Sequence, residues 1–304
     1  MLLVIEQVLN GFQLGITLFL MSAGLTLVFG IMQVINLAHG SFYMIGAYVG
    51  ATVTASTNSF ILGMVAALAA AAFAGMVVEY LVLRHLYNRD HLSQVLATFG
   101  LIMFFNEMTR IIWGRQPLFM DVPAWISGSI ELLPGLVYPL YRLAIIGVGM
   151  LVAGLLWLLF AKTKVGMQIR AGASNRQMVN ALGVNINLLY TMVFGLGTLL
   201  AGLAGVMAGP ILSVESGMGE SILILTFVVI VIGGIGSVRG AVVGALLVGM
   251  VDTLGRAFLP AVLRLFLASG YADSAAASLA SMGIYILMAI VLVWRPRGLF
   301  PAHS

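Results

Sequence analysis

The residues of this chain that could carry chemistry are few, and their spacing argues against an enzyme. The four histidines never lie four apart, so the zinc motif H-E-x-x-H is absent. No serine occupies the G-x-S-x-G turn of serine hydrolases. Neither Lys162 nor Lys164 follows a glycine, so the chain lacks the Gly-Lys-Ser/Thr loop that binds nucleotide phosphates. We therefore expect no catalytic residue, no metal site and no cofactor in this chain.

The longest polar stretch, residues 160–190, contains both lysines, two arginines and no acidic residue. Within it, Gly166 and Gly183 delimit a short segment with an apolar side and a polar side. The apolar residues are Ile169, Met178, Val179 and Leu182, and the polar ones are Arg170, Ser174, Asn175 and Arg176. A short helix parallel to the membrane would lay an apolar ridge into a partner's groove, with charges at the rim. The alternative is a solvated basic turn that only fixes topology.

Two further segments interrupt apolar stretches, Asn36–Ser41 and Gly233–Gly240. Non-helical backbone at membrane depth is tolerated where it is buried or lines a water-filled cavity, and paired interruptions point to a substrate path. The candidate pathway or gate residues are Asn36, His39, Gly40, Ser41, Gly233, Gly234 and Gly236. For the second interruption a plain cytoplasmic turn is an equal alternative, and it fits Arg239 well.

The elements that position these residues are membrane helices. The chain is 62% hydrophobic and 8% charged, with a mean hydropathy of +1.12, whereas a soluble domain is about a quarter charged. Continuous apolar runs predict an all-α, polytopic transmembrane bundle of eight or nine helices, forming a single domain of residues 1–304. The expected spans are 8–31, 40–57, 60–83, 93–113, 141–161, 188–212, 222–238, 240–266 and 280–294. The basic pI of 9.6 is better explained by membrane orientation than by nucleic acid.

The charges in the connections predict that orientation. Nine basic residues follow the third, fifth, seventh and last spans, with Asp90 the only acid among them: Arg84, Arg89, Lys162, Lys164, Arg170, Arg176, Arg239, Arg295 and Arg297. The alternate connections carry Glu6, Asp121, Glu131, Glu215, Glu220 and Asp273. The positive-inside rule places the first set in the cytoplasm, the N-terminus outside and the C-terminus inside. The long outer connection, residues 114–140, is either an interfacial loop or a docking ledge for an external partner.

Charges inside the spans are read as structural. Glu107 and Arg110 are three residues apart, and Asp252 and Arg256 are four apart, so each pair can neutralise itself on one helix face. A proton or ion relay is the alternative, which Glu79 also raises.

Three segments resemble a known family. Residues 24–50, from Gly-Leu-Thr-Leu-Val-Phe-Gly to Gly-Ala-Tyr-Val-Gly, resemble the N-terminal signature of the branched-chain amino acid ABC transporter permease family. Residues 166–185 resemble its cytoplasmic coupling loop, and Arg295-Pro-Arg-Gly-Leu-Phe300 resembles its C-terminal end. The likeness covers essentially the whole chain and favours the first of the two permease subunits.

The resemblance implies a bacterial inner-membrane importer that alternates access between the two sides. Its partners would be a sister permease or a second copy, two cytoplasmic ATPase subunits that bind ATP and Mg, and a periplasmic solute-binding protein; membrane lipid surrounds it and no nucleic acid is involved. The loop at residues 162–187, called the basic segment below, would couple to the ATPase through Gly166, Ile169, Arg170, Ala171, Asn175, Ala181, Leu182 and Gly183.

The solute and the energy source leave alternatives open. The resemblance implies branched-chain or related amino acids, but related systems carry urea, short amides or aromatic acids. An ion-coupled secondary transporter or channel should show clustered carboxylates at mid-membrane, and the sequence has none. A structural or assembly subunit would not need polar interruptions in its core.

Overall fold

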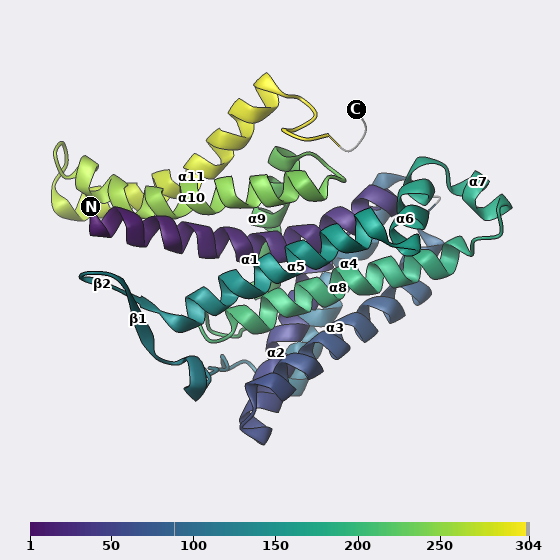
Figure 1. The fold of residues 1–304 in the computed structure, drawn as a ribbon, viewed down its shortest axis with the longest axis horizontal. Helices are drawn as coiled ribbons and strands as arrows, with labels where there is room; N and C mark the ends of the chain where they lie inside the picture. The colour runs from purple at the N-terminus through teal and green to yellow at the C-terminus, as the bar shows by residue number, and fades with distance from the viewer. Residues whose placement is uncertain (88, 302–304) are drawn as a thin grey trace. The chain divides into compact units, whose positions relative to one another are not determined.

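The computed structural model describes residues 1–87 and 89–301, and it confirms the predicted all-α class. The long helices are α1 (Leu2–Met32), α2 (His39–Thr57), α3 (Phe60–Leu81), α4 (His91–Trp113), α5 (Leu140–Lys162), α8 (Ile186–Ala208), α9 (Met218–Gly233), α10 (Val238–Leu263) and α11 (Ser269–Trp294) (Figure 1). The short elements are η1 (Leu83–His85), η2 (Ala124–Ile126), β1 (Ser129–Leu133), β2 (Leu136–Pro139), α6 (Lys164–Ser174) and α7 (Arg176–Ala181).

Within the described residues, seven helices are long and apolar enough to cross a membrane: α1, α3 continued through η1, α4, α5, α8, α10 and α11. The remaining two predicted spans are helical, but α2 is not among the seven and α9 has only 16 residues. The last helix begins at residue 269 rather than at the predicted 280. The polar-looking stretch before residue 280 is rich in alanine, the best helix former, which explains the longer helix.

Six helices begin at a side chain that caps the first turn. In each case a hydroxyl, amide or carboxylate oxygen accepts a backbone N–H that the helix itself leaves without a partner. The capping residues are Ser59, Asp90, Thr163, Asn175, Asn185 and Ser237. At Asp90, the hydrogen bonds from Ser93 hold the pKa of the carboxyl below its usual range. These polar residues therefore fix where the apolar runs start as helices.

The chain forms two compact units that interleave in sequence. The first contains residues 1–22, 124–149 and 225–304, and the second contains residues 23–123 and 150–224. The single domain predicted for residues 1–304 stays a prediction.

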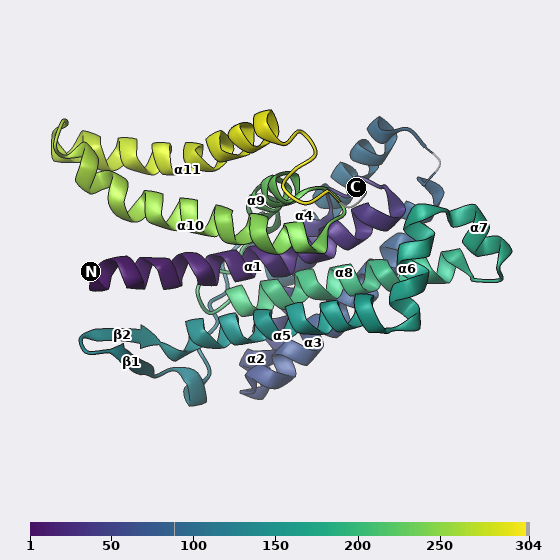
Figure 2. The same cartoon turned by 45° about the horizontal axis from the view of Figure 1, so that its top comes forward.

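Close helix packing organises the second unit. Helices α2, α3 and α8 pack together (Figures 1 and 2). A Cβ at Gly46 would lie 2.5 Å from the Cα of Gly202, and one at Gly205 would lie 2.0 Å from the carbonyl oxygen of Tyr43. Glycines on α8 therefore let the neighbouring helix backbone approach closely.

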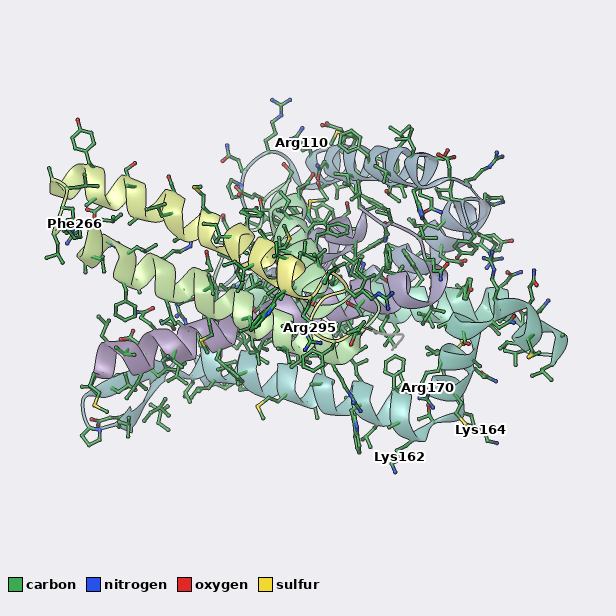
Figure 3. The ribbon with its side chains drawn as sticks, turned by 90° about the horizontal axis from the view of Figure 1, so that it is seen from above. Arg110, Lys162, Lys164, Arg170, Phe266 and Arg295 are labelled. Carbon is green, nitrogen blue, oxygen red and sulfur yellow. The ribbon has the colours of Figure 1, made fainter. Side chains whose placement is uncertain are left out.

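The first unit packs in the same way. A Cβ at Gly15 would lie 2.9 Å from the Cα of Leu246, which brings the first half of α1 against α10. Helices α10 and α11 pack against each other as a hairpin, with Phe266 near one end of α11 and Arg295 at the other (Figures 2 and 3).

The connection of residues 114–140 contains a strand pair as well as loop. Strands β1 and β2 pair antiparallel, with Ser129 opposite Pro139, and Gly135 takes the positive φ of 86° in the turn. The Tyr138 hydroxyl donates to Oδ1 of Asn10 at 3.2 Å, which anchors the hairpin to α1. Burial raises the pKa of Tyr138, so this hydroxyl stays a donor.

Candidate functional site

The basic segment folds as two short helices rather than the single helix expected from sequence. Thr163 Oγ1 accepts the N–H of Gly166 at 3.0 Å and starts α6. Asn175 Oδ1 accepts the N–H of Met178 at 2.9 Å and starts α7. Asn175 itself is extended, with φ −153° and ψ 94°. The correction follows from this side chain, because asparagine offers the backbone a local partner that competes with continuing the helix.

Gly183 ends α7 as the sequence predicts. Its φ is +85°, its N–H donates to the carbonyl of Asn180 at 3.0 Å, and the next N–H, of Val184, donates to Val179 at 3.3 Å. This pair of bonds is the Schellman arrangement, which needs a left-handed residue at the helix end. Asn185 then caps the start of α8. Hydrogen bonds therefore fix both the end of α7 and the start of α8.

The predicted apolar ridge divides between two faces. Ile169 and Val179 are buried, at 3% and 6% exposure, whereas Met178 and Leu182 are 62% and 77% exposed. The outward side gains Met167, at 56% exposure, which the sequence reasoning missed. Its spacing of three residues from Arg170, another exposed residue of α6, was the available signal.

Helix α6 is fixed to the end of α5 by backbone contacts. A Cβ at Gly166 would lie 2.2 Å from the carbonyl oxygen of Leu159, so only glycine permits this approach. The Arg170 guanidinium donates to the carbonyl of Phe160, one of the last carbonyls of α5. Figure 3 shows Lys162, Lys164 and Arg170 gathered at this junction. Arg170 therefore holds the segment as well as contributing charge, a role that the rim interpretation alone does not include.

The other predicted coupling residues, Ala171, Asn175, Ala181, Leu182 and Gly183, are all exposed. They follow the outer side of α6 and the far end of α7. The predicted set is thus partly an attachment to α5 and partly an outward surface.

A pocket of about 250 Å³ lies where the basic segment meets the end of α1. Its lining comprises Ile31, Met32, Gln33, Gly172, Ala173, Ser174, Asn175, Arg176, Gln177 and Tyr190. The Tyr190 hydroxyl donates to the carbonyl of Ile31 at 3.4 Å, and Arg176 hydrogen-bonds the same hydroxyl. Tyr190 therefore links α7, α8 and the last turn of α1. The sequence reasoning did not single it out.

The first interruption begins at Asn36, four residues after α1 ends at Met32. Asn36 Oδ1 accepts the N–H of Ala38 at 3.1 Å, so the side chain shapes the turn into α2. Gln94 of α4 accepts the N–H of Ile35 at 3.3 Å and donates to the carbonyls of Leu86 and Arg89, both at 3.2 Å. Gln94 is a second residue that the sequence reasoning missed, because all three of its partners are backbone groups and one of them, Ile35, lies 59 residues away in the chain.

The predicted pathway residues of this interruption are buried. Asn36 and His39 have no exposed surface, and Ser41 has 4%. A Cβ at Gly40 would lie 2.2 Å from the carbonyl oxygen of Gly219, so the starts of α2 and α9 touch backbone to backbone. The Asn36 Nδ2 group has no hydrogen-bond partner among the described residues.

The second interruption, in the other unit, is a tight turn between α9 and α10. Gly234 and Gly236 have positive φ values of 105° and 82°. A Cβ at Gly233 would lie 2.2 Å from the carbonyl oxygen of Gly240. Ser237 Oγ accepts the N–H of Gly240 at 3.1 Å and starts α10.

A buried charge network lies beside the basic segment. Glu79 has no exposed surface, and its carboxylate accepts hydrogen bonds from Arg84 at 3.2 Å, Tyr87 at 2.5 Å and Thr191 at 2.6 Å. Burial and the Glu79 hydrogen bond raise the pKa of Tyr87. The network ties α3 and η1 to the start of α8.

The two predicted helix-face ion pairs form. Glu107 meets Arg110 at 2.6 Å, and Asp252 meets Arg256 at 2.9 Å. Among the residues that the structure describes, no group of three or more His, Cys, Asp or Glu side chains is arranged to hold a metal ion.

Comparison with known proteins gives one family and several relatives. A family profile described as "Branched-chain amino acid transport system / permease component" matches residues 7–292. The chain is 29% identical to the high-affinity branched-chain amino acid transport system permease protein LivH of Salmonella typhimurium, over 84% of this chain and 87% of that protein. It is 29% identical to the corresponding permease protein BraD of Pseudomonas aeruginosa, over 97% of this chain and 95% of that protein.

A more distant relative carries a different name. The ribose import permease protein RbsC of Escherichia coli is 26% identical, over 77% of this chain and 72% of that protein. No solved structure matches the chain.

Proposed function

The chain belongs to the family of permease components of branched-chain amino acid transport systems, and we propose that it forms the membrane pathway of an ATP-driven importer. The basic segment is the contact with the ATPase in this proposal. The observation that carries it is the arrangement of α6 and α7: capped at each start, attached to α5, and joined through Tyr190 to the end of α1.

The proposed solute is a branched-chain or related amino acid. The names of LivH and BraD support it, and their alignments cover most of this chain. The more distant relative RbsC is named for a sugar instead. We therefore propose the solute from LivH and BraD, which are more similar to this chain than RbsC is. In such importers, the external binding protein supplies most of the selectivity.

The partners are two ATPase subunits, a periplasmic binding protein, and a sister permease or a second copy of this chain. The sequence lacks a nucleotide-binding loop, so ATP and Mg belong to the ATPase subunits. The charge distribution supports a bacterial inner-membrane orientation with the N-terminus outside and the basic segment inside.

The route of coupling follows the contacts of the second unit. A push on Met178 or Leu182 moves α7, whose Arg176 shares the Tyr190 hydroxyl with the Ile31 carbonyl. Ile31 lies five residues before Asn36, where the first interruption begins. The Asn36 Nδ2 there is fully buried and has no hydrogen-bond partner among the described residues. In this proposal, alternating access opens it as a donor to a passing solute carboxylate.

The test is a charge placed on the outward apolar surface. Leu182→Asp puts a carboxylate into the proposed docking groove, where losing an apolar anchor costs about 2 kcal/mol. The complex, reconstituted in liposomes with its ATPases and binding protein, should lose uptake by more than roughly tenfold. Its ATP hydrolysis should no longer respond to solute-loaded binding protein.

The matched control is Leu265→Asp. Leu265 is 78% exposed, against 77% for Leu182, but follows α10 at the opposite predicted side of the membrane. This variant should transport like the parent. Equal behaviour of the two variants, or uptake driven by an ion gradient without ATP, would refute the proposed function.

A further inference from the structure

The C-terminal motif Arg295–Phe300 and the second interruption are far apart in sequence, but the structure brings them together. Helix α11 ends at Trp294, directly before Arg295-Pro296, and a residue that precedes proline disfavours helical backbone. The chain then turns, with the Gly298 N–H donating to the carbonyl of Arg295 at 2.8 Å. The next two residues reach the end of α9.

Those two residues supply hydrogen bonds that α9 needs. The N–H of Leu299 donates to the carbonyl of Ile232, and the N–H of Phe300 donates to the carbonyl of Gly233, both at 2.9 Å. The last carbonyls of a helix have no partner within it, and Ile232 and Gly233 are both buried from solvent. The C-terminal segment therefore caps α9.

Two glycines make this contact possible. Gly298 has a φ of +80° and is buried, and a Cβ there would lie 2.5 Å from the Cα of Gly234. Gly234 has a φ of +105°, and its own Cβ would lie 2.7 Å from the carbonyl oxygen of Phe300. Both positions thus exclude a side chain by conformation and by space.

The contact continues to the start of α10. Gly233, whose carbonyl accepts the Phe300 N–H, packs against Gly240 of α10 on its other side. The end of α9, the turn and the first turn of α10 are thus held together as one body with residues 295–300. A turn of four residues with two left-handed glycines has little stiffness of its own.

We propose that residues 295–300 are a C-terminal clasp, a positioning element that fixes the glycine turn between α9 and α10 during transport. The functional half of this proposal rests on the proposed importer function. The docking half does not, because it concerns only contacts within this chain.

The test uses Gly298→Ala in the complete chain, combined with a single introduced cysteine, Leu299→Cys. The protein has no cysteine of its own, so the label is unique. Alanine at a left-handed position displaces the clasp and should raise the thiol-labelling rate roughly 5- to 30-fold. In the reconstituted complex it should also lower the solute imported per ATP hydrolysed.

Gly283→Ala is the matched control in α11. A Cβ there meets Val251 Cγ1 at an ordinary 3.6 Å, and no positive φ is needed. Labelling and the transport ratio should both equal those of the parent.

A second pair of variants keeps the test decisive if Gly298→Ala does not assemble. Phe300→Pro removes the N–H that Gly233 accepts, whereas Phe300→Ala keeps it and trims only a side chain that is 45% exposed. The proline variant should label faster and import less solute per ATP, and the alanine variant should match the parent.

The outcomes separate the two proposals. Unchanged labelling in Gly298→Ala and Phe300→Pro overturns the clasp. Faster labelling with an unchanged transport ratio overturns its positioning role and leaves the importer intact. A parent complex that shows no ATP-driven uptake defeats the importer and, with it, the functional half of the clasp, while labelling still decides whether the clasp docks.

Discussion

Gly183 shows how one backbone conformation sets the direction of the outward surface. Its positive φ lets α7 end in a Schellman turn, so that Leu182 projects outward one residue before the chain heads back to α8. A Cβ at this position meets nothing within 4 Å. Conformational strain is therefore the only cost of a side chain here.

Gly183→Ala should loosen the end of α7 by about 1 kcal/mol and reduce uptake accordingly, by roughly fivefold. Gly183→Asn should recover much of the loss, because asparagine tolerates the left-handed region. Gly147→Ala in α5, where a Cβ also meets nothing within 4 Å, is the control and should transport normally. Uptake would be compared in liposomes at equal amounts of assembled complex. Equal loss in the alanine and asparagine variants would contradict the conformational account.

Helix α3 ends in the buried Glu79 network, which joins it to η1 and α8. Removing one member of a buried ion pair leaves the other charge without compensation and destabilises by about 3–5 kcal/mol. The Arg84 side chain is 27% exposed and can regain some water, which places the expected cost at the lower end.

Glu79→Ala should therefore lower the Tm of the purified complex by more than about 5 °C. Glu107→Ala is the matched control, because that carboxylate also pairs with an arginine but both side chains are exposed, at 63% and 42%. Its effect should stay below about 1 kcal/mol. Similar Tm values for the two variants would show that the buried network does not stabilise the ends of these helices.

The membrane helices were predictable because burial in lipid needs long apolar runs, and these are local in sequence. Capping residues such as Asn175 were visible too, but whether an asparagine caps a new helix or sits within one depends on the fold around it. The burial of Ile169 in α6 and the exposure of Leu182 at the end of α7 depend on how these two short helices are held by the rest of the fold. Tyr190, Gln94 and the clasp make hydrogen bonds to or from backbone groups. Every residue type carries a backbone carbonyl, so the partners in these contacts cannot be recognised from the sequence.

The orientation of the complete chain remains a prediction from its charges. Nine basic residues in alternate connections predict that the basic segment lies in the cytoplasm and the β-hairpin outside. Five other arginines fall outside this set of nine basic residues: Arg110, Arg115, Arg142, Arg256 and Arg264. Arg110 pairs with Glu107, and Arg256 pairs with Asp252. Arg264 is neutralised by Asp273 at 2.8 Å, and Arg142 donates to Asn10.

Cysteines at positions 131 and 174 would test the orientation. Both native residues are exposed, so reactivity reports the side of the membrane rather than burial. In intact cells an impermeant thiol reagent should label Glu131→Cys and leave Ser174→Cys unlabelled until the membrane is permeabilised. The reverse pattern would invert the topology and remove the basic segment from the reach of any cytoplasmic ATPase.

The hydrogen bonds at the end of α9 also have an order in time. The carbonyls of Ile232 and Gly233 leave the ribosome roughly 70 residues before the amides that bind them, a delay of several seconds at about 5–20 residues per second. During that interval α9 enters the membrane without those two partners, while α10 and α11 are still being made. Completion of the turn is thus among the late events of biogenesis. A chain interrupted within α11 lacks the two hydrogen bonds that cap the end of α9.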